Sequence, residues 1–586
     1  MSIKDTYSVA RVLYDAIVRE RTDFAVIAPR PAKTKLLSPD TDDFFPQGSP
    51  RAAGLDGEAL LRFAEALSQN RTGDIHSVVV LSHGKCVFEA SRAGYDTTLP
   101  HATFSLCKTL TGIAIGMLVD DGKLTLSDKV LSFFPEWEGK LKSAKHRQLT
   151  VTHLLTMSSG ISFNETGVIT SESYMKGYFE SPIRGTPGKE FSYNSMNSYI
   201  LAAIVTRVSG LPLSEFLKER LFAPLGITNY FWESTAEGIE KGGWGLYLSP
   251  RSMAKIGQLF LDGGRVNGRA LVSREWLAAM GERHMAVSDT IGAFDYGYHM
   301  WCHKKNGTLL LNGMLGQNVL IDPAASLVVA VTSGDNCLFQ DAVAILAAFE
   351  HLQNNLPRDT MSARRLRHRL ARHFGEDGGF TPPYVSEEGK EARARLLPAL
   401  LGTFTLSKNN SGILPLVTRM IQNSPTKGIS ALCIQACGEN ELSVSFTEGE
   451  HTYSVRAGLT VFVPDVLEIH GECYRIASAY TFGLDAERTP FFKLEIRFSE
   501  MASARRLVIR PQGGGLAMLL SEQPGYPLIE HITQSMPLEE GSLLNLLVKT
   551  KTPVEWALKH ARRAFLPTVS LTPVEEERRE NDEKGV

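Results

Sequence analysis

Ser105 and Lys108 stand three residues apart in the stretch HATFSLCKTLTGIAIGMLVDDG. Side chains three apart on a helix share a face, so the lysine can reach the serine hydroxyl. A serine hydroxyl needs an adjacent base near neutral pH, and a lysine can serve once burial or cationic neighbours lower its pKa. A helix N-terminus acts in the same direction, because its free N–H groups disfavour an ammonium and stabilise an oxyanion. The pair therefore predicts a nucleophilic serine activated by a lysine.

The spacing alone is a weak signal, since it recurs in SYMK at residues 173–176 and in SPTK at residues 424–427. The second of these has a proline inside the spacing, and the first is neither preceded by a hairpin nor followed by a sustained apolar helix. Only Ser105 opens such a helix, which the DDG at residues 120–122 ends. Its predicted buried stripe consists of Leu106, Leu110, Ile113, Met117 and Leu118.

The elements around this helix follow from periodicity. A hairpin is predicted directly before it, with strands on both sides of a turn at His83 and Gly84. Helices are predicted over 57–70, 197–210, 249–264 and 340–353, and strands over 307–313, 317–322 and 326–334. The predicted order is hairpin, helices, strands and helix.

Residues 55 to 350 resemble the serine β-lactamase and penicillin-binding-protein superfamily, in its class C and esterase-like branch. SLCK matches the S-x-x-K motif, and PGKEFSYNSMNSYILAAIV matches the region of the Y-x-N motif. The family's order is kept by four further passages: QLTVTHLLTMSSGI, FAPLGITNYFW, GGWGLYLSPRSMAKIGQLFLDGGRVNG and YGYHMW. The resemblance implies a mixed α/β (α+β) fold, with a β-lactamase-like antiparallel sheet flanked by helices.

The resemblance also implies catalytic roles. Ser105 becomes the acylated nucleophile, Lys108 its proton acceptor, and Tyr193 the phenol or phenolate that passes the proton to the leaving group. A tyrosine pKa of about 10 falls when positive charge lies close, which lets the phenol act near neutrality. The alternative for Tyr193 is an aromatic ring packed at a loop.

Two motifs depart from the family pattern. Ser195 occupies the asparagine position of Y-x-N, and Asn194 stands beside it. The third motif, K-T-G or H-T-G in the family, reads Leu311, Asn312 and Gly313, so its cation is missing. In penicillin-recognising members that cation helps to hold a substrate carboxylate, so its loss argues against a β-lactam or D-alanyl-peptide substrate. Arg251 and Lys304 are basic candidates that could replace it.

The end of the third motif predicts an oxyanion hole. Gly313 permits a close backbone approach, so the N–H groups of Ser105 and Met314 can face the acyl carbonyl. Gln317 is either a substrate contact or an ordinary polar residue at a strand edge. The candidate substrate-binding residues are Asn194, Ser195, Asn312, Gly313, Met314 and Gln317.

A change of character near residue 354 divides the chain. We predict an N-terminal extension at 1–50, a hydrolase domain at 51–353 and a basic, proline-rich linker at 354–395. The alternating strands that follow predict a β-rich barrel or sandwich at 396–515, which resembles a lipocalin-like module attached to such hydrolases, and a helix with a charged tail at 516–586.

Composition narrows the possible partners. With 62 Lys+Arg against 64 Asp+Glu, no overall positive field favours nucleic acid or an anionic membrane. The first 20 residues lack the pattern of a secretory signal, no apolar run reaches membrane-spanning length, and seven scattered cysteines form no disulfide framework. We expect a cytoplasmic protein with a small-molecule substrate and no metal or cofactor, with a homo-oligomer left open.

The leading hypothesis is a serine hydrolase that cleaves an ester or amide through an acyl-enzyme. A D-amino-acid peptidase or amidase, or a β-lactamase-type activity, is the enzymatic alternative. A non-catalytic scaffold or binding protein of the same fold is the alternative from another class. No G-x-S-x-G elbow surrounds any serine, which disfavours a serine–histidine hydrolase.

Overall fold

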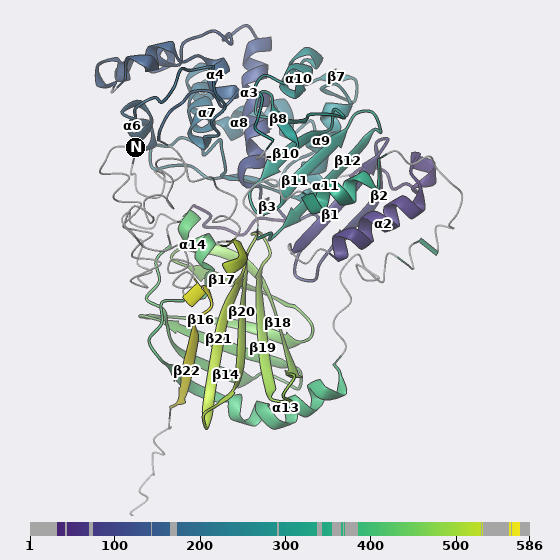
Figure 1. Ribbon diagram of the computed structural model, residues 1–586, viewed down its shortest axis with the longest axis vertical. Coiled ribbons are helices and arrows are strands. Elements are labelled where there is room, and N and C mark those ends of the chain that lie inside the picture. The colour runs from purple at the N-terminus through teal and green to yellow at the C-terminus, as the bar shows by residue number, and fades with distance from the viewer. Residues whose placement is uncertain are drawn as a thin grey trace, which may run out of the picture.

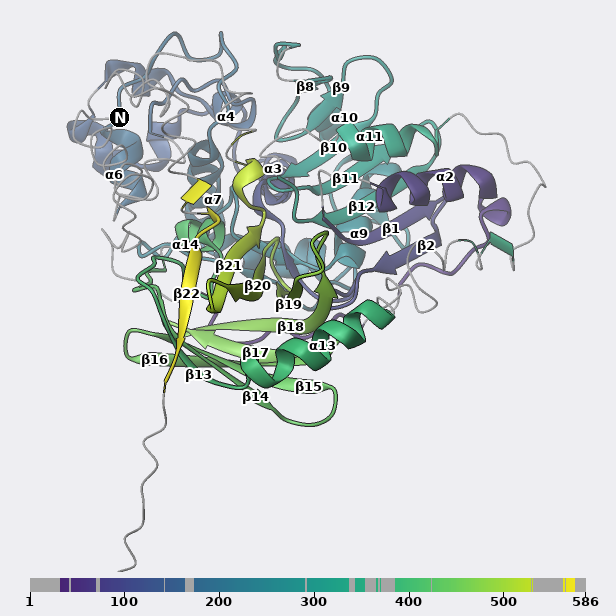
Figure 2. The same cartoon turned by 60° about the horizontal axis from the view of Figure 1, so that its bottom comes forward.

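The computed structural model has two parts, a sheet flanked by helices and a β-barrel (Figure 1). It describes residues 32–41, 44–69, 74–141, 143–163, 173–289, 292–336, 343–353, 365–366, 369, 385–422, 424–528, 530, 562–563 and 565–574. Figures 1 and 2 both show the barrel packed against one side of the first part, and Figure 1 shows strand β3 (His101–Ala102) close to it.

A seven-stranded antiparallel sheet forms the centre of the first part, in the order β2-β1-β12-β11-β10-β9-β8. Its strands are β1 (Ile75–Ser82), β2 (Lys85–Ser91), β8 (Phe294–Tyr296), β9 (Trp301–His303), β10 (Leu309–Gly313), β11 (Gln317–Asp322) and β12 (Leu327–Ser333). β1 pairs with both β2 and β12, which joins the N-terminal hairpin to the last strand of the sheet. His83 and Gly84 have φ values of 48° and 69°, as the predicted two-residue turn requires.

Both faces of this sheet are covered. Val78 and Val80 of β1 lie in one apolar cluster, and Val79 and Leu81 lie in another, because successive strand residues point to opposite faces. The first cluster includes side chains of α2 (Gly57–Ser68) and α11 (Val343–Glu350), and the second includes side chains of α3 (Lys108–Asp120) and α9 (Pro250–Leu261). Burial on both faces explains why β1 and β12 contain continuous apolar runs, whereas the edge strand β2 alternates between half-buried and buried residues.

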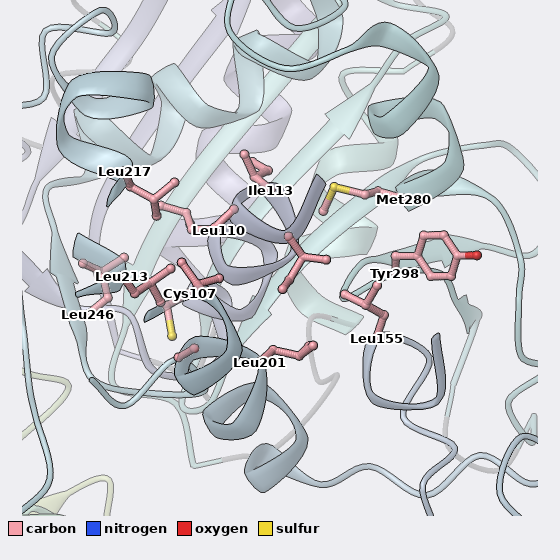
Figure 3. Close-up of a cluster of buried hydrophobic side chains, with 14 of the residues drawn as sticks. Cys107, Leu110, Ile113, Leu155, Leu201, Leu213, Leu217, Leu246, Met280 and Tyr298 are labelled. Atoms are coloured by element: carbon pink, nitrogen blue, oxygen red, sulfur yellow. The ribbon is translucent and has the colours of Figure 1, made fainter. Parts of the chain in front are cut away.

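Helix α3 is the core helix of the domain. It continues directly from the 3₁₀ helix η2 (Phe104–Cys107), and every residue from 108 to 118 is buried. Figure 3 shows Leu110 and Ile113 of α3 among side chains from several other helices. A helix that is apolar on all sides is held by its surroundings, so the turn that carries Ser105 is fixed by this packing.

Apart from the 15-residue helix α7, the remaining elements of the first part are short. The helices are α4 (Val151–Leu155), α6 (Tyr174–Phe179), α7 (Ser195–Ser209), α8 (Leu213–Leu217), α10 (Arg274–Gly281), η1 (Arg51–Ala53), η3 (Val130–Phe133), η4 (Pro135–Lys140), η5 (Ala144–Gln148) and the π-helical turn η6 (Lys218–Phe222). The small sheets are β3-β5-β4, with β4 at Phe231–Trp232 and β5 at Leu246–Leu248, and β6-β7, at Arg265–Val266 and Arg269–Ala270.

The second part is a closed barrel of nine strands, with β17 paired to its β18 as an extra strand. A parallel pairing of β16 with β18, from Gly458 to Ala479, closes the ring. Its strands are β13 (Gly402–Leu406), β14 (Ile429–Ala436), β15 (Glu441–Glu448), β16 (His451–Leu459), β17 (Val463–Ile469), β18 (Glu472–Leu484), β19 (Pro490–Phe498), β20 (Ala504–Gln512), β21 (Gly515–Gln523) and β22 (Thr568–Pro573). Helices α13 (Glu387–Leu400) and α14 (Leu416–Gln422) accompany it. Closure leaves the barrel ring without a free edge.

The predicted fold class is confirmed, and the barrel form is now decided. The barrel extends beyond residue 515, because β22 completes the wall between β13 and β21. The sequence predicts a helix and tail there, since six residues of weak alternation are a poor strand signal without their partners. Helix α13 likewise begins inside the segment predicted as a linker. The rest of that linker, the predicted final helix and the charged tail lie almost entirely outside the described residues.

In the described ranges, no single helix is long and apolar enough to cross a bilayer. Two consecutive helical segments, taken together, have the length and composition of a membrane span, but they are bent by 68° relative to each other. These segments are Ser195–Ser209 and Leu213–Phe222.

Candidate active site

Lys108 lies at the centre of a cluster of uncharged oxygens. Its Nζ is 2.8 Å from Ser105 Oγ, 2.9 Å from Ser195 Oγ and 2.6 Å from the carbonyl oxygen of Gly243. The lysine is 2% exposed, while Ser105 is half-buried. The two residues of the S-x-x-K motif therefore meet as their spacing predicts, with the serine on the more accessible side.

These contacts are compatible with an unprotonated lysine. A neutral amine has two N–H bonds and one lone pair. The Gly243 carbonyl can only accept, and the Ser195 hydroxyl can accept, which leaves the lone pair for the hydroxyl hydrogen of Ser105. This is the hydrogen-bond arrangement that a general base needs before attack.

The ring of His299 is uncharged and so adds no second positive charge near Lys108. Burial is the main cause that lowers the pKa of His299 to about 3, and Lys108 contributes less and only in its protonated form, so the imidazole is neutral near pH 7. Its Nδ1 lies 3.0 Å from the Leu155 carbonyl and its Nε2 lies 2.8 Å from Ser198 Oγ, so Nδ1 carries the proton and Nε2 accepts. The neutral ring therefore connects the Leu155 carbonyl and the Ser198 hydroxyl through two hydrogen bonds.

Tyr193 lies beside the lysine, just before helix α7. Lys108 Nζ is 4.9 Å from the centre of its ring. The ring stacks on Trp301 at 6.0 Å and meets Tyr296 edge-on at 6.2 Å. Two aromatic neighbours restrict the orientation of the phenol, so its place next to the lysine is defined by packing.

The two residues at the altered Y-x-N motif have different surroundings. Ser195 directs its hydroxyl to Lys108. Asn194 is the N-cap of α7, where its side chain accepts from the Met196 N–H and donates to the carbonyls of Ile161 and Phe163. The serine thus has the contact with the lysine, and the asparagine amide is engaged in holding the helix start.

The end of β10 touches the segment that leads to Ser105. A Cβ added to Gly313 would lie 2.1 Å from the carbonyl oxygen of Thr103, so only glycine fits there. Met314 follows Gly313 directly, and its side chain is partly buried. The predicted donors of the oxyanion hole, the N–H groups of Ser105 and Met314, therefore belong to two segments in close contact.

A family model described as Beta-lactamase matches residues 63–351, which include every site residue discussed above. This part of the chain belongs to the beta-lactamase family. Within that family, the structure places the first and second motifs around one lysine.

Individual relatives are similar over parts of the chain. The chain is 28% identical over 285 residues to a 6-aminohexanoate-dimer hydrolase of Paenarthrobacter ureafaciens, which covers 44% of this chain and 71% of that protein. It is 26% identical over 175 residues to protein flp of Staphylococcus aureus, which covers 27% of this chain and only 35% of that protein. Among solved structures, an octameric penicillin-binding protein homologue from Pyrococcus abyssi aligns with 79% of this chain and 97% of its own, at 17% identity and a TM-score of 0.40.

The third motif of this beta-lactamase-family domain has apolar and internally bonded side chains. Leu311 is 1% exposed in the apolar cluster around α3. Asn312 donates to Asn318 Oδ1 at 2.7 Å, and Gln317 donates to the Ser333 and Leu315 carbonyls. Both amides therefore have partners inside the protein, which gives them a structural role in holding the β10–β11 connection.

The two basic residues named as replacements for the missing cation are paired elsewhere in the beta-lactamase-family domain. Arg251 forms a bidentate contact with Glu89 at 2.6 and 2.9 Å, on edge strand β2. Lys304 lies 2.5 Å from Asp289 in the turn that precedes β10, at the opposite end of that strand from Gly313. Both side chains are therefore engaged in ion pairs outside the Ser105–Lys108 cluster.

One functional contact was not predicted from the sequence. Gly243 supplies the carbonyl that accepts from Lys108, and a Cβ on it would lie 2.8 Å from the Ser195 carbonyl. Gly242 is equally close to α7 and accepts from Thr111 of α3. The adjacent glycines of GGWG were the available signal, because paired glycines often mark a close backbone approach.

Proposed function

We propose that this chain is a serine hydrolase that cleaves an ester or amide bond through an acyl-enzyme on Ser105. The observation that carries the proposal is the 2.8 Å contact between Lys108 Nζ and Ser105 Oγ, formed next to uncharged partners. Burial disfavours the charged form of an amine in general, which is the condition under which a lysine can act as a base.

Each proposed step uses a group already described. Lys108 takes the proton of Ser105 as Oγ bonds to the carbonyl carbon, and the resulting oxyanion is held by the N–H groups of Ser105 and Met314. The intermediate collapses when the bond to the alcohol or amine breaks, and that group receives the proton through Tyr193. A water molecule then repeats the attack on the acyl-serine and releases the acid.

The preferred substrate class is a neutral ester or amide. Leu311 offers no charge to a substrate carboxylate, and Arg251 and Lys304 are engaged with other residues. The similarity to a relative named as a 6-aminohexanoate-dimer hydrolase supports an amide as the second class to examine. A D-amino-acid peptidase or β-lactamase-type activity and a non-catalytic scaffold are the alternatives.

Labelling with a fluorophosphonate tests the nucleophile. The wild-type protein should acquire one adduct that mass spectrometry locates on Ser105, and Ser105→Ala should lose both the adduct and turnover while it keeps nearly the same thermal midpoint. Ser424→Ala is a matched control, because Ser424 has the same spacing to Lys427 but lies in the barrel part and bonds His470 at 2.8 Å. Retained activity in Ser105→Ala would reject the proposal, and absence of labelling in a folded wild type would favour the scaffold.

The substrate can be identified from the trapped intermediate. Incubation with a library of acyl esters and amides, followed by intact-protein mass spectrometry, should yield an adduct whose mass identifies the acyl group.

A further inference from the structure

Two bulky residues beside the proposed oxyanion hole have left-handed backbone conformations. Phe104, directly before Ser105, has a φ of 48°, and Leu315, directly after Met314, has a φ of 64°. Large side chains adopt this region only when the surrounding structure holds them there. The two segments that would supply the oxyanion donors therefore need support from outside themselves.

That support comes from the barrel. Phe104 and Leu315 are 4% and 1% exposed, and both belong to an apolar cluster made mostly of barrel side chains. Barrel residues of the same cluster include Ile413, Met501 and Ala502. The nucleophile turn is thus buried on one side by its own domain and on the other by the C-terminal domain.

The contact is made by the connection between β19 and β20, residues 499–503, which we call the 499–503 hairpin. The Ala102 N–H, three residues before Ser105, donates to the Glu500 carbonyl at 2.9 Å. The hydroxyl of Tyr247 on β5 lies 3.4 Å from Met501 Sδ. A Cβ on Gly334, after β12, would lie 2.6 Å from the Ala502 carbonyl. Three consecutive hairpin residues therefore meet three different segments of the beta-lactamase-family domain.

A buried ion pair anchors the hairpin. Glu500 Oε2 is 2.6 Å from Lys33 Nζ, and each side chain is 1% exposed. Such a pair is costly to break because it leaves a buried charge without compensation. The hairpin is consequently held in a defined position from the N-terminal segment as well as from the barrel.

We propose that the 499–503 hairpin positions the catalytic turn, and that Met501 and Glu500 are positioning residues for the reaction. The hairpin's contacts with Ala102 and Tyr247, next to the cluster that buries Phe104 and Leu315, would hold the Ser105 and Met314 N–H groups at the separation that the oxyanion requires. This inference rests on the proposed function. It makes the barrel a structural part of the active site rather than an independent appended domain.

Matched methionine variants test the proposal. Met501→Ala removes the hairpin contact, and Met518→Ala makes the same change in the same apolar cluster, on β21 in the barrel wall. Both should lower the thermal midpoint. Only Met501→Ala should reduce kcat on a neutral ester and the fluorophosphonate labelling rate, by at least about tenfold with KM nearly unchanged, because loss of orientation acts on the transition state. Only Met501→Ala should also speed amide hydrogen exchange in peptides covering residues 101–107.

A second pair of variants tests the proposal if Met501→Ala does not fold. Glu500→Gln weakens the anchor, and Glu522→Gln makes the same change in the buried Arg505–Glu522 pair of the barrel, where the two atoms are 3.0 Å apart. The proposal would be overturned if a hairpin variant and its control had equal kcat and equal rates of amide hydrogen exchange at residues 101–107. It would also be overturned if the hairpin variant exchanged faster there while its kcat stayed unchanged. If the wild type neither labels nor turns over, the proposed function fails, and exchange at 101–107 still decides whether the hairpin holds the turn.

Discussion

Lys108 and Tyr193 form one unit at the level of single residues. The lysine contacts Ser105 Oγ at 2.8 Å, and its Nζ lies 4.9 Å from the centre of the Tyr193 ring. We expect Lys108→Ala and Tyr193→Phe each to lower kcat by at least about 100-fold, the usual scale for loss of a general base. Steady-state kinetics on an ester measures this, with Tyr453→Phe in the barrel as the control for tyrosine loss. A change confined to KM would move the residue from chemistry to substrate binding.

Leu311 determines a second residue-level expectation. It takes the place of a cation and is buried among apolar side chains, so a substrate carboxylate would lose its hydration without gaining a matching charge. Of two matched substrates, the methyl ester should therefore have a higher kcat/KM than the free acid. A tenfold preference for the acid, about 1.4 kcal/mol, would instead reveal an anion site.

The loop between β4 and β5 is the element that determines where the lysine ammonium or amine can sit. Gly243 lies in this loop, packs closely against the start of α7, and its carbonyl accepts from Lys108 at 2.6 Å. Gly243→Ala should displace the loop, because the new Cβ would lie 2.8 Å from the Ser195 carbonyl. We expect kcat to fall by about tenfold or more as the base loses its orientation. Gly139→Ala is the control, since nothing lies within 4 Å of a Cβ there, and equal kcat in the two variants would contradict the role of the loop.

At the scale of the whole molecule, two buried histidines lie where the two domains meet. His76 Nδ1 is 3.3 Å from His101 Nε2. Burial lowers the pKa of His101 to about 4 and the pKa of His76 well below its usual value, with Arg497 and Arg506 of the barrel also acting on His76. Both rings are therefore neutral in the folded protein at pH 7.

These pKa shifts predict an acid-sensitive fold. Below about pH 6.5 these histidines bind protons in the unfolded chain but stay neutral in the folded protein. The free energy of unfolding therefore falls as the pH drops toward 4. His101 alone should contribute about 3 kcal/mol to this loss, from its shift to a pKa of about 4. Urea unfolding from pH 7.5 to 4.5 measures it, and His101→Gln should flatten the profile while the exposed His451→Gln should not. An unchanged slope in His101→Gln would show that other groups cause the loss.

Local geometry made several features readable from the sequence alone. The contact between Ser105 and Lys108 follows from one helical turn, the hairpin follows from the positive φ of its two turn residues, and the buried course of α3 follows from its apolar composition. Each depends on residues that are neighbours along the chain, where spacing and conformation are tightly linked. The family resemblance extended this to Tyr193.

Only the tertiary structure decided the contacts between distant segments. Ser195 and Gly243 reach Lys108 across 87 and 135 residues, and Asn194 turns its amide to the 161–163 segment instead. β22 closes the barrel from a segment that reads as tail, and the 499–503 hairpin meets the nucleophile turn from nearly 400 residues away. Such contacts depend on how whole layers pack, because a short segment has the same local preferences whichever distant partner it meets.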